Sequence, residues 1–350
     1  MNRRYVSVSD CIEGDILAKD IFNQQGTVIV SKDTVLNKYI IDRLKLWDVK
    51  YIYVYGMHVA SDTDSPEEKL ARMESAYRCS VREIKELVCS IAEGRKLDEE
   101  KLNNISSSII SNINETHTII SLLDKVKSTD EYTYTHCMNV SLYSMLIGKW
   151  LKLPQHEIKK LISAGLLHDV GKTQVPSEIL NKPGRLLPEE FDIMKKHSLY
   201  GYDMLKNIRL LDQDIALAVL QHHEREDGSG YPLRLTADKI SIYSKIIAVS
   251  DVYDAVTSDR VYKKRATPFE AFKIFRDECV NSFNLSIVNT FLNNLASYYT
   301  GSKVMLSSGN IGEVAFIPPN NICKPIIRIR DTFLDLAKEK NLEIAYFIDC

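Results

Sequence analysis

The stretch LLHDVGK, from Leu166 to Lys172, places an imidazole and a carboxylate side by side at the end of an apolar run. His168 and Asp169 are neighbours in sequence, and an ammonium group follows at Lys172. Ionisable groups next to a hydrophobic core cost free energy unless they are paired or coordinated. The stretch therefore indicates a helical core that ends on an ionic or metal centre.

The apolar run before His168 is LISAGLL, and further His and Asp residues lie at or beside other apolar, helix-like runs, among them IALAVLQ and KIIAVS. A single histidine in such a place is more often a core or surface residue than a ligand. A shared metal centre, however, would satisfy the whole set at once. The candidate ligands are His136, His168, Asp169, His197, His222, His223 and Asp251.

The ligand types narrow the choice of metal. Five imidazoles with two carboxylates suit Fe, Mn or Zn better than Ca, and they are too rich in nitrogen for a pure Mg site. Seven ligands also exceed what one tetrahedral Zn can use. We therefore expect two metals with Asp169 as the bridge, because adjacent residues at a helix terminus diverge by about 100° and can serve different parts of one centre.

Two metals about 3.5–4 Å apart commonly hold a phosphate during in-line displacement at phosphorus. They lower the pKa of a shared water and neutralise charge on the phosphate oxygens. Lys172 then has a role as a nearby cation that faces the phosphate. This pattern predicts hydrolysis of a phosphate ester.

The order H…HD…H…HH…D resembles that of the HD-domain metal-dependent phosphohydrolases. The segment HHEREDGSGYP, from His222 to Pro232, together with LLHDVGK resembles the HD-GYP branch, whose members hydrolyse cyclic di-GMP. Further matches are VPSEILNKPGRL, EEFDIMKKHSLYGYDML and AVSDVYDAVTSDRVY. The resemblance covers residues 128–298, about half of the chain.

The resemblance implies that the seven candidates bind metal and that Asp169 and Lys172 act in catalysis, with Lys172 near the scissile phosphate. It also implies roles in substrate binding for the GYP loop and for two cations beyond the last metal Asp. These residues are Gly230, Tyr231, Pro232, Arg260 and Lys263. The plainer alternatives are a tight Gly- and Pro-containing turn for the loop and an exposed basic cluster for RVYKKR.

The sequence departs from the family pattern in a few places. Some members recruit a third metal with a Glu four residues before the first His; here that position is Tyr132, and Glu131 is one residue away. Val261 replaces the usual Pro, and Asn284 stands at the place of an Asp. All seven ligands are retained, so we expect a two-metal, active enzyme.

The fold class predicted is mainly α, a helical HD-type bundle with smaller β-containing parts at both ends. Residues 1–60 indicate an α+β module, with strands in GTVIV and YIYVY around one helix. The pattern predicts a helical linker over residues 61–127, with Asp98 as an N-cap. Residues 128–298 are predicted to form the catalytic domain. Residues 299–350 read as a β-rich extension that begins with a strand, a Ser-Gly-Asn turn and a strand.

Composition excludes several classes of protein. The 350 residues are 45% hydrophobic and carry a formal net charge of -2, so no general positive field favours DNA or RNA. No apolar run approaches the roughly 20 residues of a membrane span, and the start has no apolar region typical of a signal peptide. Seven scattered Cys without a CxxC pair favour a reduced, cytoplasmic setting. A homodimer remains an open option.

The function predicted is hydrolysis of cyclic di-GMP to pGpG, with further cleavage to GMP left open. Two alternatives remain at this point. One is a sensor that binds cyclic di-GMP without turnover and signals through residues 1–127. The other is a phosphohydrolase that acts on another cyclic dinucleotide or on a nucleotide.

Overall fold

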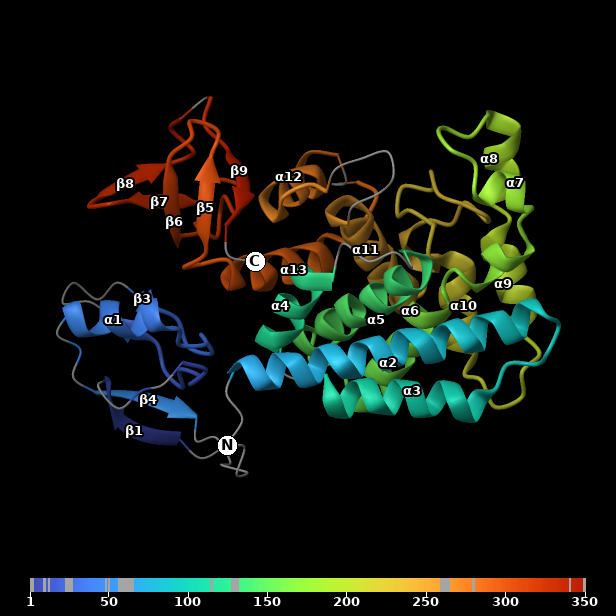
Figure 1. Cartoon of the computed structure of the whole chain (residues 1–350), viewed down its shortest axis with the longest axis horizontal. Helices are drawn as coiled ribbons and strands as arrows, with labels where there is room; N and C mark the ends of the chain where they lie inside the picture. The colour runs from blue at the N-terminus through green and yellow to red at the C-terminus, as the bar shows by residue number, and fades with distance from the viewer. Residues whose placement is uncertain are drawn as a thin grey trace. The chain divides into compact units, whose positions relative to one another are not determined.

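The computed structural model describes residues 3–8, 11, 13–22, 28–47, 49, 51–55, 66–113, 116–126, 132–258, 265–278, 281–339 and 341–348. The chain forms two compact units, 1–65 and 66–350. Figure 1 shows the elements of each unit, which are taken separately below. Within the described ranges, every helix is either too short or too polar to cross a bilayer.

The first unit is a small α+β module. Its elements are β1 (Arg3–Ser7), β2 (Ile21–Phe22), β3 (Val28–Val30), α1 (Lys38–Leu46) and β4 (Tyr51–Tyr55). β1 pairs with β4 and β2 pairs with β3, both antiparallel. Asn37 caps α1 by accepting a 2.9 Å hydrogen bond from the Ile40 amide, a common way to begin a helix. Leu17, Leu36 and Val54 are fully buried in its core.

Three helices open the second unit: α2 (Pro66–Ala92), α3 (Glu99–Asn112) and α4 (Thr116–Val126). Asp98 caps α3 by accepting from the Lys101 amide at 2.9 Å, as predicted. α2 and α3 lie side by side (Figure 1) and pack on each other. α2 also contacts α5 (Tyr132–Trp150), the helix at the centre of the unit.

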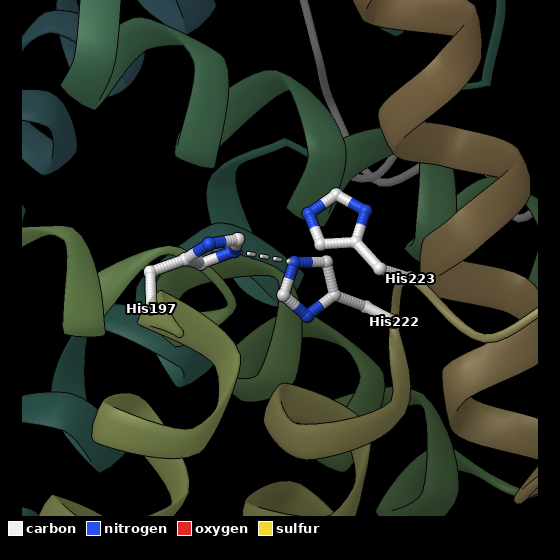
Figure 2. A group of neighbouring side chains, drawn as sticks. All are labelled: His197, His222 and His223. Atoms are coloured by element: carbon white, nitrogen blue, oxygen red, sulfur yellow. Dashed lines mark hydrogen bonds between the residues drawn. The ribbon is translucent and has the colours of Figure 1, made fainter. Parts of the chain in front are cut away.

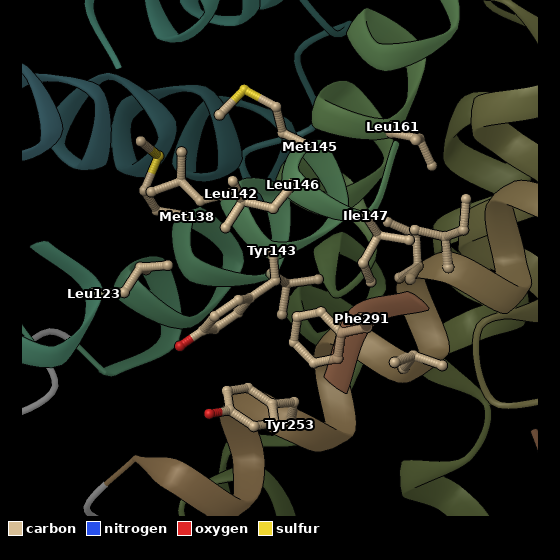
Figure 3. Packing of buried hydrophobic residues seen from close by; sticks show 14 of the residues in the cluster. Leu123, Met138, Leu142, Tyr143, Met145, Leu146, Ile147, Leu161, Tyr253 and Phe291 are labelled. Carbon is tan, nitrogen blue, oxygen red and sulfur yellow. The ribbon is translucent and has the colours of Figure 1, made fainter. Parts of the chain in front are cut away.

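α5 is buried around its whole circumference over residues 135–148, as expected for a helix inside a large core. It packs against α6 (Gln155–Leu167), α11 (Ile242–Thr257) and α13 (Leu285–Tyr298). The Tyr143 ring meets those of Tyr253 and Phe291 edge-on at 5.1 and 5.8 Å (Figure 3). This core fixes the orientation of α5 relative to α11. One candidate ligand projects from each of these two helices.

The remaining helices surround this core. They are η2 (Val170–Gln174), α7 (Ser177–Leu180), α8 (Pro188–Met194), α9 (His197–Leu205), α10 (Gln213–Gln221), η3 (Ala237–Lys239) and α12 (Pro268–Glu278). η2 and α10 both contact α9, and α10 also contacts α6 and α11. The predicted mainly α fold is confirmed.

The chain ends in an antiparallel sheet of five strands in the order β8-β7-β6-β5-β9. The strands are β5 (Lys303–Leu306), β6 (Ile311–Phe316), β7 (Ile326–Ile329), β8 (Thr332–Asp335) and β9 (Ile344–Phe347). Phe347 stacks on Phe269 of α12 with ring centroids 6.0 Å apart. The sheet thus packs on the helical body and belongs to the same compact unit, whereas the four-part division of the chain stays a prediction.

Candidate metal centre

The seven predicted ligands converge from five different helical elements. His168 and His222 stand directly after the last residues of α6 and α10, and His197 is the first residue of α9. His136 projects from α5 and Asp251 from α11. His223 and Asp251 are half-buried and the others are buried. Residues spread over more than a hundred sequence positions therefore share one site.

The ligand atoms form three overlapping groups, each with all its atoms within 4.8 Å of one another. One group is His197, His222 and His223, which Figure 2 shows with their rings clustered. The second is His136, His168 and Asp251, and the third is His168, Asp169 and His222. The first two groups have no member in common, so the described residues offer two sets of three ligands.

Asp169 lies between these two sets. Its Oδ2 is 3.3 Å from His168 Nε2, and its Oδ1 is 3.4 Å from His197 Nε2. One carboxylate thus presents an oxygen to each set, which is the placement that a bridging ligand requires. The bridging role of Asp169 stays a prediction, which this placement allows.

Three histidines are oriented in the same way. The Nδ1–H groups of His168, His197 and His222 donate to the backbone carbonyls of the residues three positions earlier, at 2.8, 2.8 and 2.7 Å. This bond fixes the tautomer and leaves the Nε2 lone pair facing the centre. Among the described residues, His168 Nε2 is buried without a hydrogen-bond partner. A buried orphan acceptor of this kind fits a bound divalent metal.

Electrostatics keeps the imidazoles of one set neutral. Burial lowers the pKa of His197 below its ordinary value and that of His222 well below it. Burial also lowers the pKa of His223 to about 3. All three rings are therefore neutral at pH 7, which is the form that binds a metal.

The carboxylates are ionised although Asp169 is buried and Asp251 is half-buried. Burial alone would raise the pKa of Asp169, but the Lys172 ammonium and the imidazole of His168 outweigh it and hold the pKa well below its usual range. Burial alone would also raise the pKa of Asp251, but the hydrogen bond from His136 outweighs it and holds the pKa well below its usual range. The two carboxylates thus offer anionic oxygens, and His197, His222 and His223 offer neutral nitrogens, a donor set suited to Fe, Mn or Zn.

His136 is held differently from the other histidines. Its Nδ1 lies 2.7 Å from Asp254 Oδ2, and its Nε2 lies 3.1 Å from Asp251 Oδ1. Burial lowers the pKa of His136, but these two carboxylates outweigh it and raise the pKa to about 10. Asp254 was not among the predicted site residues. Its signal was its position three residues after Asp251, which places both on the same side of α11.

Lys172 lies in η2, three residues after Asp169, and its Nζ is 2.6 Å from Asp169 Oδ2. Burial lowers the pKa of Lys172, but the contact with Asp169 raises it to above the ordinary value, so the ammonium is charged. Between them, Gly171 packs against α9 so closely that a Cβ there would lie 1.9 Å from the His197 carbonyl oxygen. Glycine is therefore required for this stretch to meet the helix that carries His197.

The GYP loop lies beside the centre. The Tyr231 ring lies over the ring of His223, with centroids 4.6 Å apart and planes 31° apart. A Cβ on Gly230 would lie 2.5 Å from the His223 carbonyl oxygen, so only glycine allows this approach. The Tyr231–Pro232 peptide is cis. The loop is thus both a tight turn and a wall of the site.

Glu224 is a second residue that the sequence interpretation missed. It is buried, and its two carboxylate oxygens accept hydrogen bonds from the amides of Leu233 and Leu235 at 2.5 and 2.8 Å. These bonds tie the far side of the GYP loop to the residue next to His223. Nothing in the motif HHERED distinguishes Glu224 from an ordinary exposed acid.

Several sequence predictions fall outside the described residues. Arg260, Lys263 and Glu131 lie there, and Tyr132 begins α5 with a side chain that is not described. Their roles stay predictions, as does the absence of a third metal. Asn284, by contrast, caps α13 and donates to Glu226 Oε1 at 3.1 Å.

Comparison with known proteins points the same way. Residues 121–283 match the family model described as HD domain. A cyclic di-GMP phosphodiesterase from Pseudomonas aeruginosa is 36% identical over 228 residues, which are 65% of this chain and 54% of that protein. A 3'3'-cGAMP-specific phosphodiesterase from Vibrio cholerae is 39% identical over 146 residues, 41% of this chain and 28% of that protein.

A solved structure shares the fold. It is an HDG"Y"P protein from Bdellovibrio bacteriovorus, 16% identical, with a TM-score of 0.57 over 84% of this chain and 99% of that one. The first curated relatives are longer: the chain spans 54% and 58% of their lengths. The family match and the relatives agree with the resemblance to the HD-domain phosphohydrolases that the motifs carry.

Proposed function

We propose that this chain, in which residues 121–283 form an HD domain, is a metal-dependent phosphodiesterase that hydrolyses cyclic di-GMP to linear pGpG. The observation that carries the proposal is the position of Asp169 between two sets of three ligand atoms, with the Lys172 ammonium at 2.6 Å. Relatives named cyclic di-GMP phosphodiesterases at 36% identity support the choice of substrate.

In this proposal two divalent ions, Fe or Mn, bind at the site. His136, His168 and Asp251 would hold one ion, and His197, His222 and His223 would hold the other, with Asp169 placed between the two sets. When bound, such a pair of ions supplies positive charge at the phosphate and a hydroxide near neutral pH. The orphan Nε2 of His168 and the neutral imidazoles of the second set are consistent with this assignment.

The residues of the chain then act as follows. Lys172 places its ammonium next to a non-bridging phosphate oxygen and stabilises the charge that develops there. Tyr231 covers one side of the substrate. A water oxygen bonds to phosphorus, the bond from phosphorus to the ribose 3′ oxygen breaks, and a proton from the water ends on that 3′ oxygen. Arg260 and Lys263 are proposed to bind a second phosphate and a base, as a bidentate contact and a point charge.

A second substrate deserves a place in the test. The relative from Vibrio cholerae that is 39% identical is named for 3'3'-cGAMP. Both cyclic dinucleotides present the same phosphodiester to the site and differ in one base. Discrimination between them would depend on contacts to that base and leave the chemical step unchanged.

The experiment is a substrate panel under reducing conditions. Protein freed of metal and reloaded with Mn²⁺ or Fe²⁺ is incubated with cyclic di-GMP, 3'3'-cGAMP or a mononucleotide, and products are identified by chromatography and mass spectrometry. We expect pGpG from cyclic di-GMP and none from the Asp169→Ala control. Intact cyclic di-GMP together with cleavage of a mononucleotide would refute the proposal, and tight binding without turnover would favour a sensor.

We further propose that the protein acts in the cytoplasm, since its seven Cys are scattered and lack a CxxC pair. The near-neutral net charge of -2 gives no general positive field, so we propose that the protein does not bind DNA or RNA. A homodimer is also proposed, with the helices that precede the HD domain as its contact region. Sedimentation of the full chain would test it.

A further inference from the structure

A continuous chain of hydrogen bonds joins helix α2 to the candidate ligand His136. The Tyr77 hydroxyl donates to Asn139 Oδ1 at 2.8 Å, and Asn139 Nδ2 donates to Asp254 Oδ1 at 2.9 Å. Asp254 Oδ2 then lies 2.7 Å from His136 Nδ1. All four side chains are buried, with exposed fractions of 2, 3, 0 and 5%.

The chemistry of these groups fixes the direction of every bond. A carboxylate oxygen accepts hydrogen bonds, so His136 donates its Nδ1–H to Asp254, and its Nε2 faces the other candidate ligands, with Asp251 Oδ1 3.1 Å away. For the same reason Asn139 must turn its NH₂ group toward Asp254. The Asn139 carbonyl oxygen then faces α2, and the Tyr77 hydroxyl is the donor that satisfies it.

Carboxylates that accept from the second nitrogen of a ligating histidine orient the ring and raise its basicity. In this protein the carboxylate is itself held by Asn139, and Asn139 is held by Tyr77. The three supports come from α11, α5 and α2. Two of them lie within the matched HD domain, but Tyr77 lies well before residue 121, where the match begins.

α2 is well placed to transmit a change. It is the first helix of the second unit, and it directly follows residues 1–65 in the sequence. It contacts α5, from which His136 projects, and η2, which carries Lys172. A rotation of α2 that withdrew the Tyr77 hydroxyl would leave Asn139 Oδ1 buried and unsatisfied, and a buried acceptor without a partner is costly in free energy.

We propose that Tyr77 is a positioning residue for the metal centre: through Asn139 and Asp254 it orients His136, so that α2 sets the metal affinity of the set formed by His136, His168 and Asp251. The inference rests on the ligand role of His136 in the proposed function. It adds a control point outside the HD domain and makes the helix that follows the first unit part of the metal site.

The test compares two Tyr→Phe variants. Tyr77→Phe removes the hydroxyl that holds Asn139. Tyr299→Phe is the matched control, because Tyr299 is 3% exposed and its hydroxyl donates to Asp124, which is not a candidate ligand, at 3.3 Å. Metal-free protein is titrated with Mn²⁺ by calorimetry, and the thermal midpoint of the metal-free form is measured in parallel.

Loss of one outer support of a metal ligand typically weakens metal binding about 10–100-fold. For Tyr77→Phe, two bonds further out, we expect about tenfold weaker binding at one of two Mn²⁺ steps and no change at the other. Tyr299→Phe is expected to lower the thermal midpoint by a similar amount and to leave both steps unchanged. Asn139 is one hydrogen bond closer to His136, so Asn139→Ser is expected to weaken the same Mn²⁺ binding step more. It replaces Tyr77→Phe in the test if that variant does not fold.

The outcomes separate the two proposals. A folded Tyr77→Phe or Asn139→Ser protein that binds Mn²⁺ at both steps within twofold of wild type would overturn the inference and leave the proposed function standing. A wild-type protein that binds no Mn²⁺ would overturn the metal centre, and with it both proposals. An equal loss in Tyr299→Phe would show a general effect of stability and would also overturn the positioning role.

Discussion

Gly171→Ala is the most informative single substitution for the geometry of the site. The new Cβ would lie 1.9 Å from the His197 carbonyl oxygen and 2.4 Å from the Gly201 amide nitrogen, and both are backbone atoms. Ordinary contact begins near 3.4 Å, so η2 and α9 must separate by about 1.5 Å. Because neither neighbour is a flexible side-chain end, we expect a cost at the upper end of the 1–3 kcal/mol typical of overpacking, about 3 kcal/mol.

A cost of about 3 kcal/mol corresponds to a fall of roughly 6 °C in the thermal midpoint for a domain of this size. The same movement separates Asp169 and Lys172 from His197, and a misplacement of about 1 Å at a reacting centre can cost about 10²-fold in rate. Circular dichroism melting measures the thermal midpoint, the rate of cyclic di-GMP hydrolysis measures the misplacement, and Mn²⁺ stoichiometry shows whether the metal content changes as well. Gly148→Ala in α5 is the matched control, since its nearest neighbour is the flexible Leu161 Cδ1 at 2.8 Å. A Gly171→Ala protein with unchanged midpoint and metal content would refute the close-packing argument.

Three further predictions concern the ligands and the substrate. Asp169→Ala should lose metal and activity together, because it removes the carboxylate between the two sets; full metal content by mass spectrometry would contradict the bridge. Arg260→Ala should keep both metals and raise KM for cyclic di-GMP with little change in kcat, as expected for a phosphate contact; a loss of metal would contradict that role. Saturation of the metal-free protein with Mn²⁺ at about 100 times Kd should stabilise it by about 2.7 kcal/mol for each bound ion, seen as a higher thermal midpoint, and His168→Ala should reduce this gain.

The convergence of the candidate ligands was predictable from the sequence because their residue types are costly next to apolar runs. His168 at the end of LISAGLL and His222 at the end of IALAVLQ both carry that signal. The helical bundle followed from the same runs. The Ser-Gly-Asn turn between β5 and β6 was predictable as well, from local turn chemistry.

The hydrogen-bonded pairs that support the ligands were not predictable. Asp254 and His136 are 118 positions apart, and Tyr77 and Asn139 are 62 apart; such pairings depend on how α2, α5 and α11 pack. The sequence does not show whether Gly171 is needed for a turn or for a close contact with a helix. Only the position of α9 decides between these two roles. The strand β8 was missed because TFLD offers only four residues with no clear alternation.

The central claim is that two metals bind between the two sets of imidazoles and carboxylates. The measurement that tests it most directly is anomalous diffraction from crystals of the Mn²⁺-loaded protein. We predict two peaks about 3.5–4 Å apart, one beside His136, His168 and Asp251, the other beside His197, His222 and His223, with Asp169 between them. A map with no peak at these residues, or with Mn²⁺ bound elsewhere, would contradict the account.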